Sequence, residues 1–180
     1  KKADQLISRL EYYEAFKVYQ EGGKPFENDR NLLYRKYKTL IEAQQAITEQ
    51  SDSARAHLQL GKAYYDHALE LPEADRRKEA LERAKKHLER SIGLQENMEQ
   101  AFLILATVMD KLGISQQFQP FIPLMEKIKN KSDATLLFLG AKYFRQQKDD
   151  QAMDYLDAVP DSSPQRVEAD YYQGLIYARK

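Results

Sequence analysis

The chain has 180 residues, of which 31% are charged and 42% hydrophobic, a composition typical of a soluble helical domain and not of a disordered chain. Its 28 basic and 28 acidic residues cancel, so the net basic charge expected of a nucleic-acid-binding domain is absent. No apolar run approaches the roughly 20 residues needed to span a bilayer, and the absence of cysteine excludes disulfides, thiolate metal sites and a cysteine nucleophile. The location stays open between the cytoplasm and a bacterial periplasm, and we expect any membrane association to depend on segments outside this chain.

The N-terminal part of the chain is predicted to form two helices. Helical periodicity runs from about residue 4 to residue 21 and stops at Gly22-Gly23-Lys24-Pro25. Asn28 or Asp29 can cap a second helix that continues to about residue 50. Residues 1–52 are therefore expected to form an N-terminal helix pair.

Helical patterns continue through the rest of the chain. Ser51-Asp52-Ser53 forms a turn and an N-cap for a helix to about residue 71, and a highly charged helix follows over residues 74–94. A helix over 98–112 ends at Gly113 as its C-cap. Because proline fits only in a first helical turn, Pro120 and Pro123 predict that the next helix begins near Gln119. Helices over 133–146, 149–158 and from 165 onward complete nine helices, and we find no strand pattern.

A short phrase recurs along these helices. Ala106, Gly140 and Gly174 are 34 residues apart, and each small residue is followed three positions later by a large one. The phrase also occurs at Gly61, 45 residues before Ala106. A small residue flanked by large ones at a long, fixed period indicates stacked repeats of one supersecondary unit. Short turns between amphipathic helices predict that each helix packs antiparallel on its sequence neighbour.

Over about residues 54–180 the chain resembles the tetratricopeptide repeat (TPR) family, whose motif is W-x2-L-G-x2-Y on a first helix and A-x3-F, then P, on a second. The best match is the segment from Leu136 to Pro164, which supplies the motif positions Leu136, Leu139, Gly140, Tyr143, Ala152, Leu156 and Pro164. The resemblance implies an all-α fold, a right-handed α-solenoid of antiparallel helix pairs. Gly140 and Ala152 are small so that the two helices can approach.

The resemblance divides the chain into repeats at 53–97, 98–131 and 132–165. Residues 166–180 form either the first helix of a further repeat or a capping helix, and residues 1–52 could be a degenerate repeat. The 53–97 repeat holds 11 extra residues around 66–77, which predict an elongated, projecting hairpin. In the 98–131 repeat, Phe118 replaces a small alanine, so its second helix is expected to be distorted.

In the TPR family the first helices line a concave groove. The implied groove residues are Leu58, Lys62, Tyr65, Leu103, Thr107, Asp110, Leu137, Phe138, Phe144, Tyr171, Tyr172 and Leu175. This lining is mostly apolar and aromatic, which suits an amphipathic helix or a hydrophobic segment of a protein partner. The alternative occupant is a C-terminal helix of the full protein. Some TPR proteins grip acidic tails with a basic clamp, but only Lys62 is basic in this set.

No catalytic, cofactor or metal site is predicted. His57, His67 and His87 are the only histidines, and we interpret them as packing or surface residues. Nucleotide-binding, nucleophile-elbow and zinc-protease motifs are absent from the sequence. The sequence therefore predicts a non-catalytic protein–protein interaction scaffold, within a multi-protein or membrane-associated assembly. The alternative is a regulatory or targeting module of a larger enzyme whose catalytic domain lies outside this chain.

Overall fold

The computed structural model describes residues 38–179, except 39, 43, 46, 47, 50 and 51, and every regular element in these residues is helical. The helix predicted over residues 4–21 and the start of the second lie outside the described residues. The elements from residue 54 onward are α4 (Ala54–Glu70), α5 (Ala74–Leu94), α6 (Glu99–Lys111), the 3-10 helix η2 (Ser115–Phe121), α7 (Ile122–Lys127), α8 (Asp133–Arg145), α9 (Asp149–Asp157) and α10 (Arg166–Arg179). None of the described helices is long and apolar enough to cross a bilayer.

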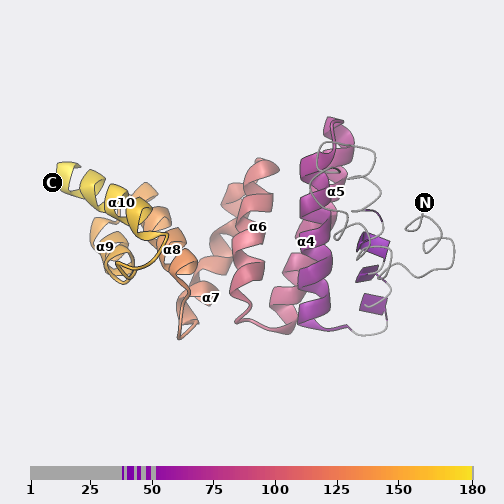
Figure 1. The fold of residues 1–180 in the computed structure, drawn as a ribbon, viewed down its shortest axis with the longest axis horizontal. Coiled ribbons are helices and arrows are strands. Elements are labelled where there is room, and N and C mark those ends of the chain that lie inside the picture. Colours follow the sequence, from indigo (N-terminus) through magenta and orange to yellow (C-terminus); the bar gives the residue numbers. More distant parts are fainter. Residues whose placement is uncertain (1–37, 39, 43, 46–47, 50–51, 180) are drawn as a thin grey trace. The chain divides into compact units, whose positions relative to one another are not determined.

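The chain divides into two compact units, Lys1–Phe118 and Gln119–Lys180. In unit 1, α4 and α5 pack side by side as a hairpin, and α6 lies against both (Figure 1). Helices α4 and α5 lie close together at Gly61. An added Cβ atom there would lie 2.7 Å from the Leu88 Cγ atom and 3.2 Å from the Ala84 carbonyl oxygen. Where α4 begins and α5 ends, the Ser91 hydroxyl donates to the Ala54 carbonyl at 2.7 Å. Small residues at the predicted positions therefore allow the close helix contact.

The extra residues of this hairpin form additional helical turns. Helices α4 and α5 have 17 and 21 residues, against 13 and 9 in α8 and α9. The turn between them is held by Arg77, whose guanidinium donates to the Leu71 carbonyl at 2.7 and 3.1 Å and to the Pro72 carbonyl at 3.2 Å. Ser53 is the N-cap of α4, as predicted, and its hydroxyl accepts from the Ala56 amide at 3.2 Å.

The end of α6 confirms the predicted glycine C-cap. Gly113 has φ +73°, the left-handed region that glycine adopts at little cost. Its amide donates to the Asp110 carbonyl at 2.9 Å, and the Ile114 amide donates to the Met109 carbonyl at 2.9 Å. These two bonds form a Schellman motif, which satisfies carbonyls that the helix end would leave unpaired.

The predicted start of the next helix was wrong. The α-helix begins at Ile122 and not near Gln119, and residues 115–121 form the 3-10 helix η2. Pro123 occupies the first turn of α7, where its missing N–H costs nothing, so the α-helix cannot extend much further back. Phe118 is buried in η2. This 3-10 helix is the distortion that Phe118 and the two prolines predict for the second helix of the 98–131 repeat.

In unit 2, α10 lies against both α8 and α9 (Figure 1). A Cβ atom on Gly140 would lie 2.6 Å from the Leu156 Cδ2 atom and 3.4 Å from the Ala152 carbonyl oxygen. Gly140 in α8 and Leu156 in α9 therefore repeat the contact that Gly61 makes with Leu88. Helix α10 turns Ala169 and Ile176, both buried, toward the interior.

A carboxylate joins three helices of unit 2. Glu126 of α7 accepts hydrogen bonds from the hydroxyls of Tyr143 in α8 and Tyr155 in α9, the latter at 3.3 Å. The two tyrosine rings stack with centroids 5.8 Å apart. Burial, followed by the field of Glu126, raises the pKa of Tyr155 to about 12, and burial with the Glu126 hydrogen bond raises the pKa of Tyr143 further. The phenols are therefore held in their neutral, donating form.

Candidate functional site

The predicted groove residues of unit 1 differ in how much surface they offer. Lys62, Thr107 and Asp110 are exposed, Tyr65 and Leu103 are half-buried, and Leu58 is buried in α4 and offers little surface to a partner. Polar groups in this set are partly engaged within the chain. The Thr107 hydroxyl donates to the Leu103 carbonyl at 3.0 Å, and the Asp110 carboxylate accepts from Ser115 at 2.9 Å.

The predicted groove residues of unit 2 include three aromatic rings in contact, here called the aromatic cluster: Phe144, Tyr171 and Tyr172. Phe144 of α8 lies 5.4 Å from Tyr172 of α10, and Tyr172 lies 5.7 Å from Tyr171, between ring centroids. Tyr171 is 62% exposed. Of the other predicted residues, Leu137 and Phe138 are half-buried on α8, and Leu175 is exposed on α10.

An arginine that the sequence analysis missed completes this surface. The Arg179 guanidinium lies over the Phe144 ring, 4.5 Å from its centroid, at a distance typical of a cation–π contact. Arg179 also pairs with Asp149 at the start of α9, its Nε atom 3.1 Å from Oδ2. Asp149 and Arg179 lie on different helices, and neither belongs to the repeat motif, so the sequence carried no signal for their pairing.

Histidines gather at the α4–α5 hairpin of unit 1. The His57 and His87 Nδ1 atoms lie 2.9 Å apart, so one nitrogen donates and the other accepts, and His57 Nε2 lies 2.7 Å from the Asp52 carboxylate. The His87 ring stacks on Tyr64 at 5.8 Å. Burial lowers the pKa of His87 to about 4, and the charges of His57 and Lys86 add to the effect. The interpretation of the histidines as packing or surface residues did not include a contact between His57 and His87.

The contacts of His57 and His87, here called the histidine junction, link α4 to α5 and to Asp52, which precedes α4. Arg90 and then His57 hold the pKa of the Asp52 carboxyl below its usual range, so the carboxylate stays charged and orients the His57 ring. Arg90 also pairs with Asp52 directly. Within the described part of the chain, no group of three or more histidine and carboxylate side chains is placed to hold a metal ion.

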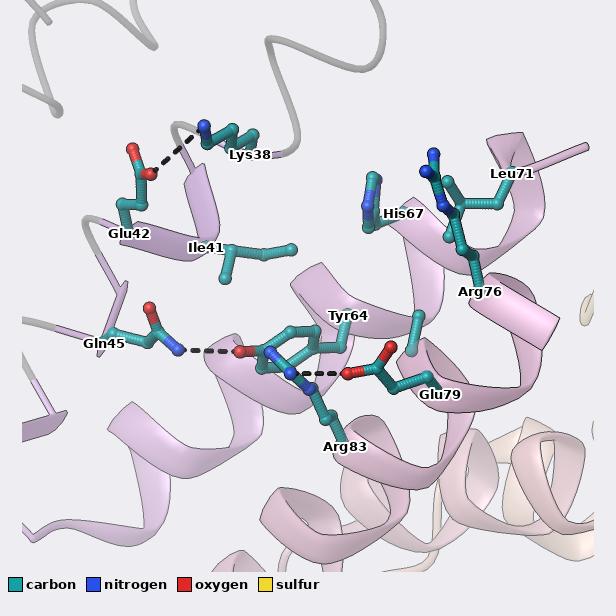
Figure 2. Close-up of a pocket in the computed structure, with 11 residues that line it drawn as sticks. Lys38, Ile41, Glu42, Gln45, Tyr64, His67, Leu71, Arg76, Glu79 and Arg83 are labelled. Atoms are coloured by element: carbon teal, nitrogen blue, oxygen red, sulfur yellow. Dashed lines mark hydrogen bonds and ion pairs between the residues drawn. The ribbon is translucent and has the colours of Figure 1, made fainter. Parts of the chain in front are cut away.

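A cleft of about 390 Å³ lies between the α4–α5 hairpin and four residues that precede it, Lys38, Ile41, Glu42 and Gln45 (Figure 2). Three side-chain pairs line it: Lys38 with Glu42 at 4.0 Å, Gln45 with Tyr64 at 2.7 Å, and Arg83 with Glu79 at 2.6 Å. The Arg83 guanidinium also lies 5.8 Å from the centroid of the Tyr64 ring. Arg76 also lines the cleft and pairs with Glu73 outside the lining, at 3.9 Å. Each of these charged side chains therefore has a partner within unit 1.

Comparisons with known proteins bear on the fold. No model of a protein family matches the sequence, and no curated protein matches it. Among solved structures, the chain is similar to TTC0263, a thermophilic TPR protein of Thermus thermophilus, with a TM-score of 0.58 and 15% identity over 98% of this chain and 95% of that one. It is also similar to MamA, with a TM-score of 0.48 and 19% identity over 100% of this chain and 98% of that one. The likeness to TTC0263 confirms an all-α fold of the TPR type.

Proposed function

We propose that this chain, which has the fold of TPR proteins, is a non-catalytic scaffold that binds a segment of another protein. TPR folds commonly serve protein–protein interaction, because stacked helix pairs build extended surfaces. The observation that supports the proposal here is the aromatic cluster with Arg179 above it. It joins α8 to α10 within unit 2 and leaves Tyr171 accessible.

The chemistry of this surface favours an apolar or amphipathic segment. Six large apolar side chains are exposed in the described residues, and four of them lie on α10. A concentration of exposed apolar groups on one helix is typical of an interaction surface. Aromatic residues and arginine are also the residues that most often dominate binding energy at protein interfaces. We therefore expect Phe144, Tyr171 and Arg179 to contribute most, with Leu137 and Leu175 beside them.

Site-specific photo-cross-linking tests the proposal. A photoreactive benzoylphenylalanine replaces Phe144 or Tyr171 in two separate variants, and Gln151, exposed on α9 in the same unit, in a matched control. The variants are irradiated in a lysate of the source organism, and the products are identified by mass spectrometry. We expect positions 144 and 171 to cross-link the same protein, and position 151 to miss it. Equal labelling from all three positions, or labelling from Gln151 alone, would contradict the proposed surface.

A further inference from the structure

A second pocket of unit 1 lies where α4 ends, α5 begins and α6 ends, and is here called the hairpin pocket. Its volume is about 390 Å³, near the lower end of the roughly 300–1,000 Å³ typical of small-molecule sites. Five residues line it: Ala68, Leu69, Arg77, Leu81 and Lys111. Three of them, Ala68, Leu69 and Arg77, fall in the stretch 66–77, around which this repeat holds its 11 extra residues. The extension of the α4–α5 hairpin, which the repeat motif does not explain, therefore supplies most of the hairpin pocket.

The apolar part of the lining comes from both helices of the hairpin. Ala68 of α4 and Leu81 of α5 are buried, whereas Leu69 of α4 is 49% exposed. Leu69 is one of six large apolar side chains that are exposed in the described residues. A hydrocarbon group in the pocket would remove its side chain from water, which is favourable.

The charged part of the lining is basic. The Arg77 guanidinium is fixed by the hydrogen bonds that its Nε and Nη2 atoms donate to the carbonyls of Leu71 and Pro72. Carbonyls at a helix end carry only partial negative charge, and the Arg77 Nη1 atom makes no hydrogen bond to a described residue. Lys111 is exposed, and no ion pair joins it to a described carboxylate. Both cations can therefore still bind an anion.

The hairpin pocket differs in this respect from the cleft of Figure 2, whose charged side chains are paired within unit 1. None of the described residues that line the hairpin pocket is acidic. Glu70, Glu73 and Asp75 are, however, exposed along the same turn. A ligand with several negative charges, or an anionic membrane surface, would meet these carboxylates and be repelled. The charges therefore favour a ligand with a single negative group.

We propose that the hairpin pocket binds an aliphatic monocarboxylate, a small acid with one carboxylate and a hydrocarbon chain of medium length. The carboxylate accepts hydrogen bonds from Arg77 and Lys111, and charge-assisted bonds of this kind are stronger than those between neutral groups. The hydrocarbon chain covers Leu69 and lies against Ala68 and Leu81. A mostly apolar lining with a few polar groups that orient the ligand is typical of small-molecule sites.

Titration of the whole chain with octanoate, below the concentration at which it forms micelles, tests the proposal. Amide chemical shifts in nitrogen–proton correlation spectra report where it binds. We expect one saturable site, with the shifted amides concentrated at residues 68–69, 77–81 and 111. Octanol has the same hydrocarbon chain without the charge and should bind roughly tenfold more weakly. Shifts scattered over the whole chain, or equal binding of octanol and octanoate, would overturn the proposal.

Two variants with exposed side chains test the two parts of the pocket. Lys111→Gln removes one cation and should weaken octanoate binding roughly three- to tenfold, with an unchanged melting temperature. Leu69→Gln removes apolar contact and should weaken binding to a similar extent. Lys62→Gln is the matched control, because Lys62 is also exposed in unit 1 but lies outside the lining. Unchanged binding in Lys111→Gln, or an equal loss in Lys62→Gln, would contradict the site.

A peptide that ends in leucine distinguishes a free acid from the carboxyl terminus of a protein. Such a peptide should not displace octanoate at equal concentration, since its backbone would extend past the small pocket toward the exposed carboxylates of the turn. Displacement at a lower concentration than that of octanoate overturns the assignment to a small acid. The hairpin pocket shares no residue with the aromatic cluster, so these results are independent of the proposed scaffold function.

Discussion

Leu156 of α9 occupies the space that a side chain on Gly140 of α8 would need, because a Cβ atom there would lie 2.6 Å from Leu156 Cδ2. We expect Gly140→Leu to destabilise the chain strongly, since the leucine must displace a fully buried neighbour. Overpacking of this kind typically costs about 1–3 kcal/mol. Denaturant unfolding followed by circular dichroism gives the change in the midpoint and in the free energy of unfolding.

Gly93→Ala is the control for this prediction. Gly93 is exposed in α5 with open space around it, and alanine is a better helix former than glycine by about 1 kcal/mol. The variant should therefore be as stable as the wild type or more so. Equal losses of stability in both variants would mean that Gly140 has no special role in helix contact.

The link between Glu126 and the two tyrosines should be measurable as a coupling energy. Glu126→Gln and Tyr143→Phe each weaken a charge-assisted hydrogen bond, and the double variant removes the shared interaction. A double-mutant cycle should give a coupling of about 0.5–3 kcal/mol. Lys127→Gln, exposed on the same helix, is the control and should show no coupling with Tyr143→Phe.

Alkaline titration should detect tyrosines that lose their proton at a higher pH than an ordinary tyrosine does. Tyr155 has a pKa raised to about 12, whereas an unfolded tyrosine ionises near pH 10. The unfolded chain therefore loses its proton first, and the stability that this group contributes is lost as the pH rises from about 10 to 12. Absorbance at 295 nm should show a late component that is smaller in Tyr155→Phe. Identical titration curves would contradict the buried position of this hydroxyl.

Acid should weaken the histidine junction. The pKa of His87 is about 4 in the folded chain, below its ordinary value of 6.5, so the unfolded chain binds the proton more readily. Stability should therefore fall as the pH drops through the interval between these two values. We expect the melting temperature of the wild type to decrease more between pH 7 and pH 4.5 than that of His87→Gln. Parallel decreases in the two proteins would show that His87 does not carry this pH dependence.

Substitutions in the predicted groove should affect binding more than folding. Tyr171 is exposed, so Tyr171→Ala should weaken binding of the cross-linked partner while the melting temperature stays nearly unchanged. Leu137→Asp introduces a charge on a half-buried apolar position and should weaken binding further, with a modest loss of stability. The comparison is reversal of the charges at Arg76 and Lys86 on α5, which should leave binding intact. Loss of the partner only in the α5 variant would move the functional surface to the α4–α5 hairpin.

Helix periodicity and the repeat phrase were sufficient to predict the helices from residue 54 onward, because both follow from local spacing. The start of α7 was not predictable, since two closely spaced prolines permit either an α-helical or a 3-10 path before Ile122. The TPR resemblance placed Phe144 and Tyr171 in one groove, and both rings contact Tyr172. It also selected Leu58, which the fold buries. Pairings such as His57 with His87 depend on how two helices face each other, which periodicity does not determine.

The glycine–leucine contact of each hairpin joins residues that are close in sequence, with Gly140 only 16 positions before Leu156. The loop that must close to form it is short, so its entropic cost stays small and does not increase when further repeats are added. Contacts of such short range are also typical of chains that fold quickly. A stack assembled from these hairpins can therefore lengthen without a corresponding loss of folding speed.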